Sequence, residues 1–300
     1  MKKHCGFIAI VGRPNVGKST LLNAILGQKI SITSQRPQTT RHRILGIKTE
    51  EQTQYIYVDT PGMHKAQKRE MNKMMNKAAT NALRDVDAVL FVVEGTRWTE
   101  EDEIVAKNIE HLTIPVMLVV NKVDLVVPRE NLLPHIQTLQ QRFPQHQVVL
   151  LSAKQKDGVH DLEQQVLVHL PESEHFYFPD DQVTDKSQRF MVAELIREKL
   201  TRELGQELPY ELTVEIEQFE VKEKIINIAA IIWVEREGQK AILIGKGGER
   251  LKRIGKHARL DMEKVLSRKV FLQLWVRVKS GWSNDIRALK SLGYDNGESD

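Results

Sequence analysis

Residues 7–20, FIAIVGRPNVGKST, decide the fold of the N-terminal half of this 300-residue chain. The run FIAIV is typical of a buried strand, and the segment STLLNAIL that follows the loop has the period of a helix. Between them, residues 12–19 match the pattern G-x-x-x-x-G-K-[ST]. Its glycines allow backbone N–H groups to face a phosphate, and the helix directs its positive end at the same point. The sequence therefore predicts a phosphate-binding loop rather than an ordinary strand-to-helix turn.

Two residues of this loop are expected to have specific roles. Lys18 should reach the β- and γ-phosphates of a nucleotide, and the hydroxyl of Ser19 should bind Mg²⁺. The other members of the nucleotide-binding set in this loop are Gly12, Arg13, Pro14, Asn15, Val16, Gly17 and Thr20.

A base-binding motif lies further along the chain, where the tetrapeptide NKVD follows the strand-like run VMLVV. The carboxylate of Asp124 can accept from the ring N–H and the exocyclic amine of guanine, whereas adenine lacks this donor pair and would leave the carboxylate unpaired. We expect Asn121 to bind N7 and to tie this loop to the phosphate loop, with the Lys122 stem along the base. Ser152 and Ala153 follow the next strand, and the Ala153 N–H is expected to meet guanine O6.

Two further segments are expected to approach the Mg²⁺ and the γ-phosphate. In the DTPG segment, Asp59 should hold Mg²⁺ from its outer shell and Gly62 should offer an N–H to the γ-phosphate; the alternative is a plain Pro-Gly turn. Thr60 and Pro61 complete the set at this turn. The polar stretch at residues 31–43 is interpreted as a mobile loop, in which Thr40, in preference to Thr39, binds Mg²⁺ and the γ-phosphate. The predicted catalytic residues are Lys18, Thr40 and Gly62.

The pattern along the chain predicts two domains. Short apolar runs alternate with helical segments through about residue 170, which is typical of an α/β fold with a mostly parallel sheet and helices on both faces. The predicted strands in this half are residues 7–11, 55–58, 88–93, 116–120 and 147–151. We therefore expect a nucleotide-binding domain at 1–170, a Pro- and Asp-rich linker at 171–187, and a smaller α+β domain at 188–300.

The second half is expected to run in the order αββαβ, with a Gly-rich turn between its second strand and a basic helix. This turn has the G-x-x-G arrangement of KH domains, which clamps the backbone of about four nucleotides. Residues 246–259 hold six Lys and Arg against one Glu, a local balance of +5. A connecting turn beside a solvated helix is the alternative, but element order and charge favour RNA binding. The predicted RNA-binding residues are Gly245, Lys246, Gly247, Gly248, Arg250 and Lys252.

Composition limits the remaining function classes. Cys5 is the only cysteine, which excludes an internal disulfide and a thiolate zinc cluster. The ten His are scattered without metal-ligand spacing. No apolar run approaches the roughly 20 residues needed to span a bilayer, and no signal-peptide pattern precedes the first strand. We expect a cytoplasmic protein.

The motifs in this order resemble the translation-factor class of P-loop GTPases. The stretches GRPNVGKSTLLN, QTTRHR, DTPG, FVVEGTRW and NKVD, with the C-terminal module, closely resemble the Era family of bacterial ribosome-assembly GTPases over essentially the whole chain. The resemblance implies a Mg²⁺-dependent GTPase that binds GTP and GDP, with a type II KH domain. It also implies binding to the 3′ end of 16S rRNA and assistance in 30S subunit assembly by a monomer, with some peripheral association with the inner membrane.

Two residues bear on how hydrolysis would proceed. Met63 stands where many GTPases carry a water-orienting Gln, so hydrolysis is expected to be slow alone and to depend on the loops, a partner or a monovalent cation. Asn15 stands where cation-dependent relatives bind K⁺, and it either binds this ion or only shapes the loop. The alternatives to a GTPase switch are an RNA-binding protein with a purely structural nucleotide site and a GTPase for tRNA modification. The intact site residues argue against the first, and the chain length argues against the second.

Overall fold

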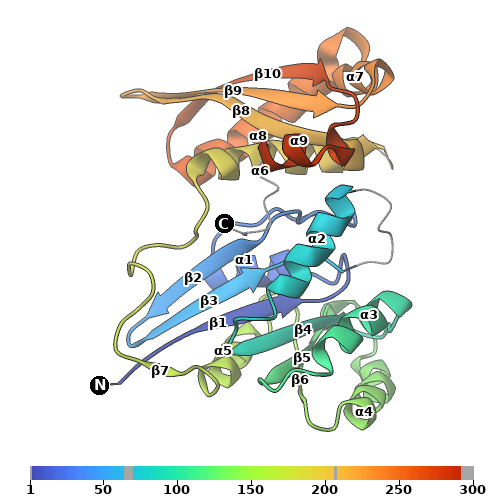
Figure 1. Cartoon of the computed structure of the whole chain (residues 1–300), viewed down its shortest axis with the longest axis vertical. Coiled ribbons are helices and arrows are strands. Elements are labelled where there is room, and N and C mark those ends of the chain that lie inside the picture. The colour runs from blue at the N-terminus through green and yellow to red at the C-terminus, as the bar shows by residue number, and fades with distance from the viewer. Residues whose placement is uncertain (1, 64–69, 206–207, 292–300) are drawn as a thin grey trace. The chain divides into compact units, whose positions relative to one another are not determined.

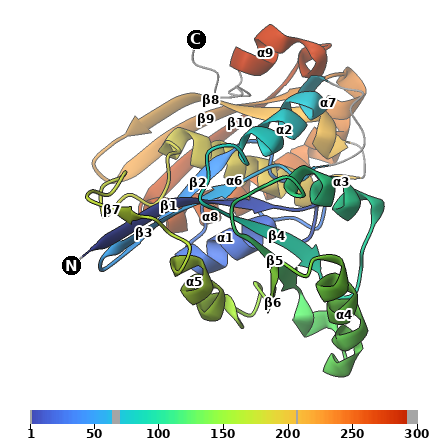
Figure 2. The same ribbon diagram turned by 60° about the horizontal axis from the view of Figure 1, so that its bottom comes forward.

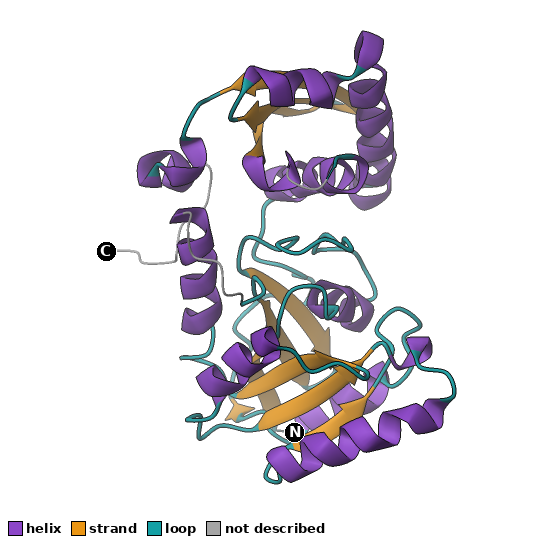
Figure 3. Cartoon of the chain, turned by 90° about the vertical axis from the view of Figure 1, so that its right-hand side faces the viewer, coloured by secondary structure: helices purple, strands orange, loops and turns teal. Residues whose placement is uncertain are grey.

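The computed structural model describes residues 2–63, 70–205 and 208–291 of the chain. These residues form two compact units, and the main part of the second starts at Lys186. In each unit a sheet is packed against helices (Figures 1 and 3). The two units are described separately below.

The first unit is built on a seven-stranded sheet of order β2-β3-β1-β4-β5-β6, with the short strand β7 added to β1. β2 runs antiparallel to β3, and the pairs from β3 to β6 are parallel, which confirms the predicted mostly parallel sheet. The strands are β1 (Lys3–Val11), β2 (Ile44–Glu50), β3 (Thr53–Asp59), β4 (Ala88–Glu94), β5 (Val116–Asn121), β6 (Gln147–Leu150) and β7 (Glu172–Ser173).

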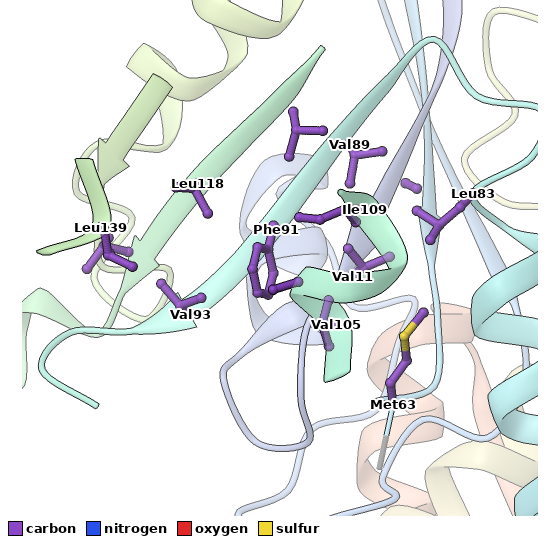
Figure 4. Packing of buried hydrophobic residues seen from close by; sticks show 14 of the residues in the cluster. Val11, Met63, Leu83, Val89, Phe91, Val93, Val105, Ile109, Leu118 and Leu139 are labelled. Carbon is purple, nitrogen blue, oxygen red and sulfur yellow. The ribbon is translucent and has the colours of Figure 1, made fainter. Parts of the chain in front are cut away.

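Helices cover both faces of this sheet, with α1 and α5 on one face and α2, α3 and α4 on the other (Figures 1 and 2). Their bounds are α1 (Lys18–Leu26), α2 (Glu70–Asn81), α3 (Glu100–Ile109), α4 (Leu133–Arg142) and α5 (Val159–Leu167). The central strands are therefore buried on both sides, and β4 is apolar from Ala88 to Val93. Beneath α3, Val105 and Ile109 pack on Phe91 and Val11 from the sheet (Figure 4).

The predicted linker at 171–187 belongs, as far as Asp185, to the first unit. β7 pairs with the start of β1, and the ring of Tyr177 lies 5.4 Å from that of Phe7. The side chain of Gln54 accepts from the N–H groups of Tyr177 and Phe178, both at 3.0 Å. Among the described residues between β7 and α6 (Gln188–Glu203), this segment forms no further helix or strand, in agreement with its Pro and Asp residues.

The second unit is a three-stranded sheet of order β10-β9-β8 covered by helices, as the expected α+β domain requires. β9 is antiparallel to β8 and parallel to β10. The elements are α6 (Gln188–Glu203), β8 (Leu212–Val221), β9 (Ile225–Val234), α7 (Glu237–Ile244), α8 (Glu249–Leu266), β10 (Lys269–Val278) and α9 (Ile286–Ser291). Among the residues that the structure describes, no helix is both long and apolar enough to cross a membrane.

The expected order αββαβ lacked two helices: α9, which follows β10, and α7, which lies between β9 and the Gly-rich turn. The strand IINIAAIIWV passes into α7 with no Pro or Asn turn between them, so no helix start was apparent. The side chain of Gln239 provides it by accepting from the N–H groups of Glu235 and Arg236 at 2.8 and 3.0 Å. The turn therefore joins two helices rather than a strand and a helix.

Candidate functional site

The predicted nucleotide motifs meet at one edge of the first unit's sheet. Parallel strands end on the same side, and loops that follow them form the binding edge of open α/β sheets. The phosphate loop follows β1, DTPG follows β3, NKVD follows β5, and Ser152 follows β6. Motifs that are far apart in the sequence therefore meet in one site.

The phosphate loop has the backbone that only glycine allows at two points. Gly12 and Gly17 have φ of 153° and 105°. A Cβ atom on Gly12 would lie 2.4 Å from the Val92 carbonyl oxygen, and one on Gly17 would lie 2.2 Å from the amide nitrogen of Asn121. Both glycines are therefore fixed by close neighbours as well as by conformation. α1 begins directly after Gly17, at Lys18.

Lys18 is a buried cation at the centre of this loop, with 6% of its surface exposed. Its Nζ donates to the carbonyl oxygens of Gly12 and Arg13, both at 2.9 Å. Burial lowers the pKa of Lys18 to about 8, because desolvation outweighs the attraction of the Asp59 carboxylate. A buried ammonium held by carbonyl dipoles beside a helix N-terminus is matched to an anionic ligand.

Ser19, Thr40 and Asp59 come together beside Lys18. The Ser19 hydroxyl lies 2.6 Å from the Thr40 hydroxyl and donates to Oδ2 of Asp59 at 2.8 Å. Ser31, which sequence reasoning missed, also donates to this oxygen, at 2.9 Å. Thr39 instead donates to the Arg36 carbonyl at 2.7 Å, so the structure brings Thr40, not Thr39, to the carboxylate.

The chemistry of this group fits a hard divalent cation. Asp59 is fully buried, and its Oδ1 has no hydrogen-bond partner among the described residues. Burial raises the pKa of Asp59, against the opposing effects of Lys18 and the three hydroxyls. The two hydroxyl oxygens are suited to bind Mg²⁺ directly, and the orphaned carboxylate oxygen is suited to accept from a water molecule on the metal.

The base-binding motifs are linked to each other and to the phosphate loop. The Asn121 amide donates to the Val16 carbonyl at 2.8 Å, which is the expected tie between the loops. The Ser152 hydroxyl donates to Oδ1 of Asp124 at 2.6 Å and so orients this carboxylate. The Ala153 N–H, expected at guanine O6, donates within the protein to Oδ1 of Asn121 at 3.0 Å.

A charge network behind the phosphate loop was not predicted. Nη2 of Arg13 donates to Glu94 at 2.5 Å, and its Nε donates to the buried Asp102 at 3.0 Å. Glu94 also accepts from Lys122 at 3.1 Å. The Arg13 side chain therefore supports the phosphate loop rather than contacting the phosphates. Asp102 also accepts from the N–H of Thr99 at 2.8 Å at the start of α3, so one carboxylate caps a helix and holds the loop.

Gly62, the last residue of DTPG, lies at the site, whereas the next residue, Met63, lies in the core. A Cβ atom on Gly62 would lie 2.7 Å from the Pro14 nitrogen, so only glycine allows this contact between the two loops. Met63 is 3% exposed and packs in the core cluster with Val11 and Leu83 (Figure 4). Helix α2 follows from Glu70, and residues 64–69 lie outside the described residues.

The Gly-rich turn of the second unit lies between α7 and α8 and is largely open. Lys246 and Gly247 are exposed, and a Cβ atom on Gly247 or Gly248 would meet nothing within 4 Å. Three turn residues have positive φ: Gly245 at 73°, Gly247 at 58° and Gly248 at 79°. This backbone gives free approach from solvent, as contact with a phosphate chain requires.

The basic residues after the turn differ in their surroundings. Nη1 of Arg250 donates to the Ile242 carbonyl at 2.5 Å and so braces the turn, whereas Lys252 is exposed. Arg253 is paired with Glu203 at 2.7 Å. Ile254 is fully buried in the core of the second unit.

The doubly wound sheet with this phosphate and base site, followed by a unit with a G-x-x-G turn, defines a P-loop GTPase domain joined to a KH domain. Residues 7–122 match the family model described as 50S ribosome-binding GTPase, and residues 207–283 match that of the KH domain. The chain is 57% identical over 290 residues to GTPase Era of Pseudomonas entomophila (strain L48), covering 97% of this chain and 96% of that protein. GTPase Era of Pseudomonas aeruginosa (strain LESB58) is equally similar, at 57% over 97% of this chain and 95% of its own. The chain belongs to the Era family of GTPases.

Two solved structures of Era are similar to this chain over 97% of its length. A crystal structure of an Aquifex aeolicus Era variant bound to GDP·AlF4⁻ superposes with a TM-score of 0.93 at 38% identity, covering 97% of this chain and 99% of that one. A crystal structure of Era in complex with MgGDPNP and nucleotides 1506–1542 of 16S ribosomal RNA superposes with a TM-score of 0.94, with the same identity and coverage.

Proposed function

We propose that this chain is a cytoplasmic switch that binds and hydrolyses GTP, binds 16S rRNA near its 3′ end and assists assembly of the 30S subunit. The observation that carries the proposal is the buried Lys18 beside the linked Ser19, Thr40 and Asp59. A buried cation and an orphaned carboxylate oxygen in one loop cluster are costly unless a ligand compensates for them. A nucleoside triphosphate with Mg²⁺ compensates for both, because its phosphates are negative charges for Lys18 and Mg²⁺ is a positive charge for the Asp59 carboxylate.

At the phosphates, each residue has a distinct task. Lys18 neutralises the β- and γ-phosphates, and the phosphate-loop N–H groups surround them. Ser19 and Thr40 hold Mg²⁺ directly, and Asp59 holds it through its outer shell. When bound, Mg²⁺ neutralises negative charge on the phosphate oxygens. The Gly62 N–H binds the γ-phosphate, and its contact with Pro14 couples this turn to the phosphate loop.

At the base, Asp124 distinguishes guanine from adenine. Its carboxylate is oriented by the Ser152 hydroxyl, which leaves acceptor positions for the two guanine N–H donors. Adenine offers no such pair, and this mismatch is expected to cost several kcal/mol, of order 2–4. The family relatives are GTPases by name, in agreement with this preference.

Hydrolysis by the site alone is slow in this proposal. Met63 is buried in the core, and its thioether cannot orient an attacking water as a Gln side chain does. The rate therefore depends on ordering of the segment around Thr40, on a partner, or on a monovalent cation near Asn15. A slow intrinsic rate suits a switch whose turnover is set by its target.

The second unit binds single-stranded RNA at the G-x-x-G turn. Gly245, Gly247 and Gly248 let the phosphate backbone approach, and Lys246 and Lys252 are exposed to supply charge. The Era structure in complex with nucleotides 1506–1542 of 16S rRNA supports the 3′ region as the target.

RNA crosslinking in cells with sequence readout tests the proposed function. The wild-type protein is expected to crosslink to the 3′ region of 16S rRNA, and Lys18→Ala to lose most of this signal because it cannot reach the GTP state. Unaltered crosslinks in Lys18→Ala would leave an RNA-binding protein without a nucleotide switch. The absence of 16S crosslinks in the wild type would contradict the rRNA target.

A further inference from the structure

The side chains of β10 divide into two rows of opposite character. The row that faces the helices is apolar throughout and packs in the core of the second unit: Val270, Leu272, Leu274, Val276 and Val278. The opposite row, continued by one residue beyond the strand, carries three cations, two aromatic rings and one amide: Lys269, Phe271, Gln273, Trp275, Arg277 and Lys279. Alternation along a strand places this second row on the outer face of the sheet.

The two aromatic rings of the outer row are exposed although they stand on a rigid strand. Phe271 is 51% exposed and Trp275 is 54% exposed. In the register with β9, Phe271 lies beside Asn227 and Trp275 lies beside Ile231. Rings of this size are normally buried, and a pair of them in one exposed row indicates a binding surface.

The outer face continues onto β9 with a third aromatic residue. Trp233 pairs with Arg277 in the strand register, and Nζ of Lys279 lies 5.9 Å from the centre of its ring. Between Ile225 and Trp233, the outer row of β9 contains no charged residue. The positive charge on this face is therefore concentrated along β10.

We propose that the outer row of β10 is a second RNA-binding surface, on which a single strand stacks bases against Phe271 and Trp275. Lys269, Arg277 and Lys279 contact its phosphates. The two rings are four residues apart, about 13 Å along an extended strand, so each receives a different base. Exposed aromatic rings interleaved with cations are the means by which sheets bind single-stranded nucleic acid without base pairing. The inference rests on the proposed RNA-binding function and extends it to a face of the sheet away from the G-x-x-G turn.

The charge distribution favours a narrow strand over a membrane surface. Acidic residues occupy the outer side of β8, where Glu215 lies opposite Ile231 and Glu220 lies opposite Asn227. An anionic bilayer laid on this face would meet these carboxylates, whereas a single RNA strand can follow β10 alone. Gln273 also interrupts the apolar surface between the two rings, which disfavours insertion into lipid.

The test uses the full-length protein and a fluorescein-labelled, 20-nucleotide single-stranded RNA of mixed sequence, with binding followed by anisotropy. Phe271→Ala combined with Trp275→Ala is expected to weaken binding at least about 30-fold, since base stacking contributes about 1–3 kcal/mol per base and the variant loses two stacked bases. Trp275→Tyr should retain most of the affinity. Leu260→Ala removes a side chain that is 39% exposed on α8, and it should bind as the wild type does. Circular dichroism melting establishes that each variant is folded.

Two outcomes would overturn the inference while leaving the proposed function intact. The first is wild-type affinity in the double variant, together with loss of affinity in a G-x-x-G variant. The second is a double variant that binds RNA as the wild type does but loses the binding to phosphatidylglycerol vesicles that the wild type shows. This result would assign the surface to a membrane. If the wild type binds no RNA of this length, both the proposed RNA function and this inference fail.

Discussion

The nucleotide site and the G-x-x-G turn both use glycine and lysine to meet phosphate, but they are built in opposite ways. In the first, Lys18 is buried and Gly17 is pressed against Asn121. In the second, Lys246 is exposed and Gly247 has open space around it. The same residue types therefore form an enclosed site in one unit and an open surface in the other.

This difference determines what each site can recognise. An enclosed site can leave a wrong ligand with unpaired buried groups, which gives selectivity between similar molecules. An open turn relies on charge and backbone approach, which gives affinity for a polyanion with less selectivity and with strong salt dependence. The enclosed site should also be the one in which small substitutions damage folding and binding together.

The largest expected effect comes from the same substitution made in both loops. Gly17→Ala places a Cβ atom 2.2 Å from the Asn121 amide at a φ of 105°, so GDP affinity should fall at least about a hundredfold, or roughly 2.7 kcal/mol. Gly247→Ala meets no neighbour and should cost only about 1–2 kcal/mol of stability for its left-handed backbone. Titration with fluorescent GDP and thermal melting measure both effects. Equal GDP affinity in the two variants would remove the contrast between the loops.

The next effect is confined to the second unit. Lys246→Asp combined with Gly247→Asp is expected to abolish RNA binding, because it replaces a cation with carboxylates where phosphates approach. GTP affinity should be unchanged. The control Lys224→Asp alters an exposed charge in the turn between β8 and β9 and should retain RNA binding. RNA affinity equal to that of the wild type in a filter assay would contradict the KH assignment.

A tenfold effect is expected from the network behind the phosphate loop. Burial raises the pKa of Glu94, but hydrogen bonds from Arg13 and Lys122 outweigh it and lower the pKa overall, so the carboxylate is charged. Glu94→Gln keeps the shape but loses the charge, and guanine nucleotide affinity should fall about tenfold, or roughly 1.4 kcal/mol. Glu103→Gln, whose partner Arg142 is at the surface, should have no effect on nucleotide affinity. Calorimetry with GDP distinguishes the two variants.

The smallest expected effect concerns Asn15. Its side-chain amide donates to the Gln35 carbonyl at 2.9 Å, which joins the phosphate loop to the polar segment before Thr40. If Asn15 also binds a monovalent cation, single-turnover GTP hydrolysis should be severalfold faster in K⁺ than in Na⁺. Asn15→Asp should alter this ratio. Equal rates in the two salts would leave Asn15 with only the loop-shaping role.

The sequence predicted those features that hydrophobic periodicity and short motifs mark locally. The mostly parallel sheet followed from apolar runs that alternate with helical segments, the two-domain organisation from the loss of this pattern after about residue 170, and the family resemblance from the motifs. What it did not show are pairings set by the fold: Arg13 lies 81 residues from Glu94 and 89 residues from Asp102. No local signal connects such residues, although Glu94 stands inside a stretch that carried the family resemblance.

Helix α7 was missed for a different reason. Its start is stabilised by the Gln239 side chain rather than by a Ser, Thr, Asp or Asn cap, and Gly238 in its first turn suggests a loop. The packing of Leu243 into the core secures the helix, and this contact exists only in the folded unit. Tertiary burial thus overrode a weak local preference.

Calorimetric titration of the full-length protein with GTP and with ATP, both with Mg²⁺, tests the central claim most directly. The enclosed site with Asp124 held by Ser152 predicts that GTP binds at least about a hundredfold more tightly than ATP, a difference of roughly 2.7 kcal/mol. Comparable affinities for the two nucleotides, or no binding of either, would contradict the account.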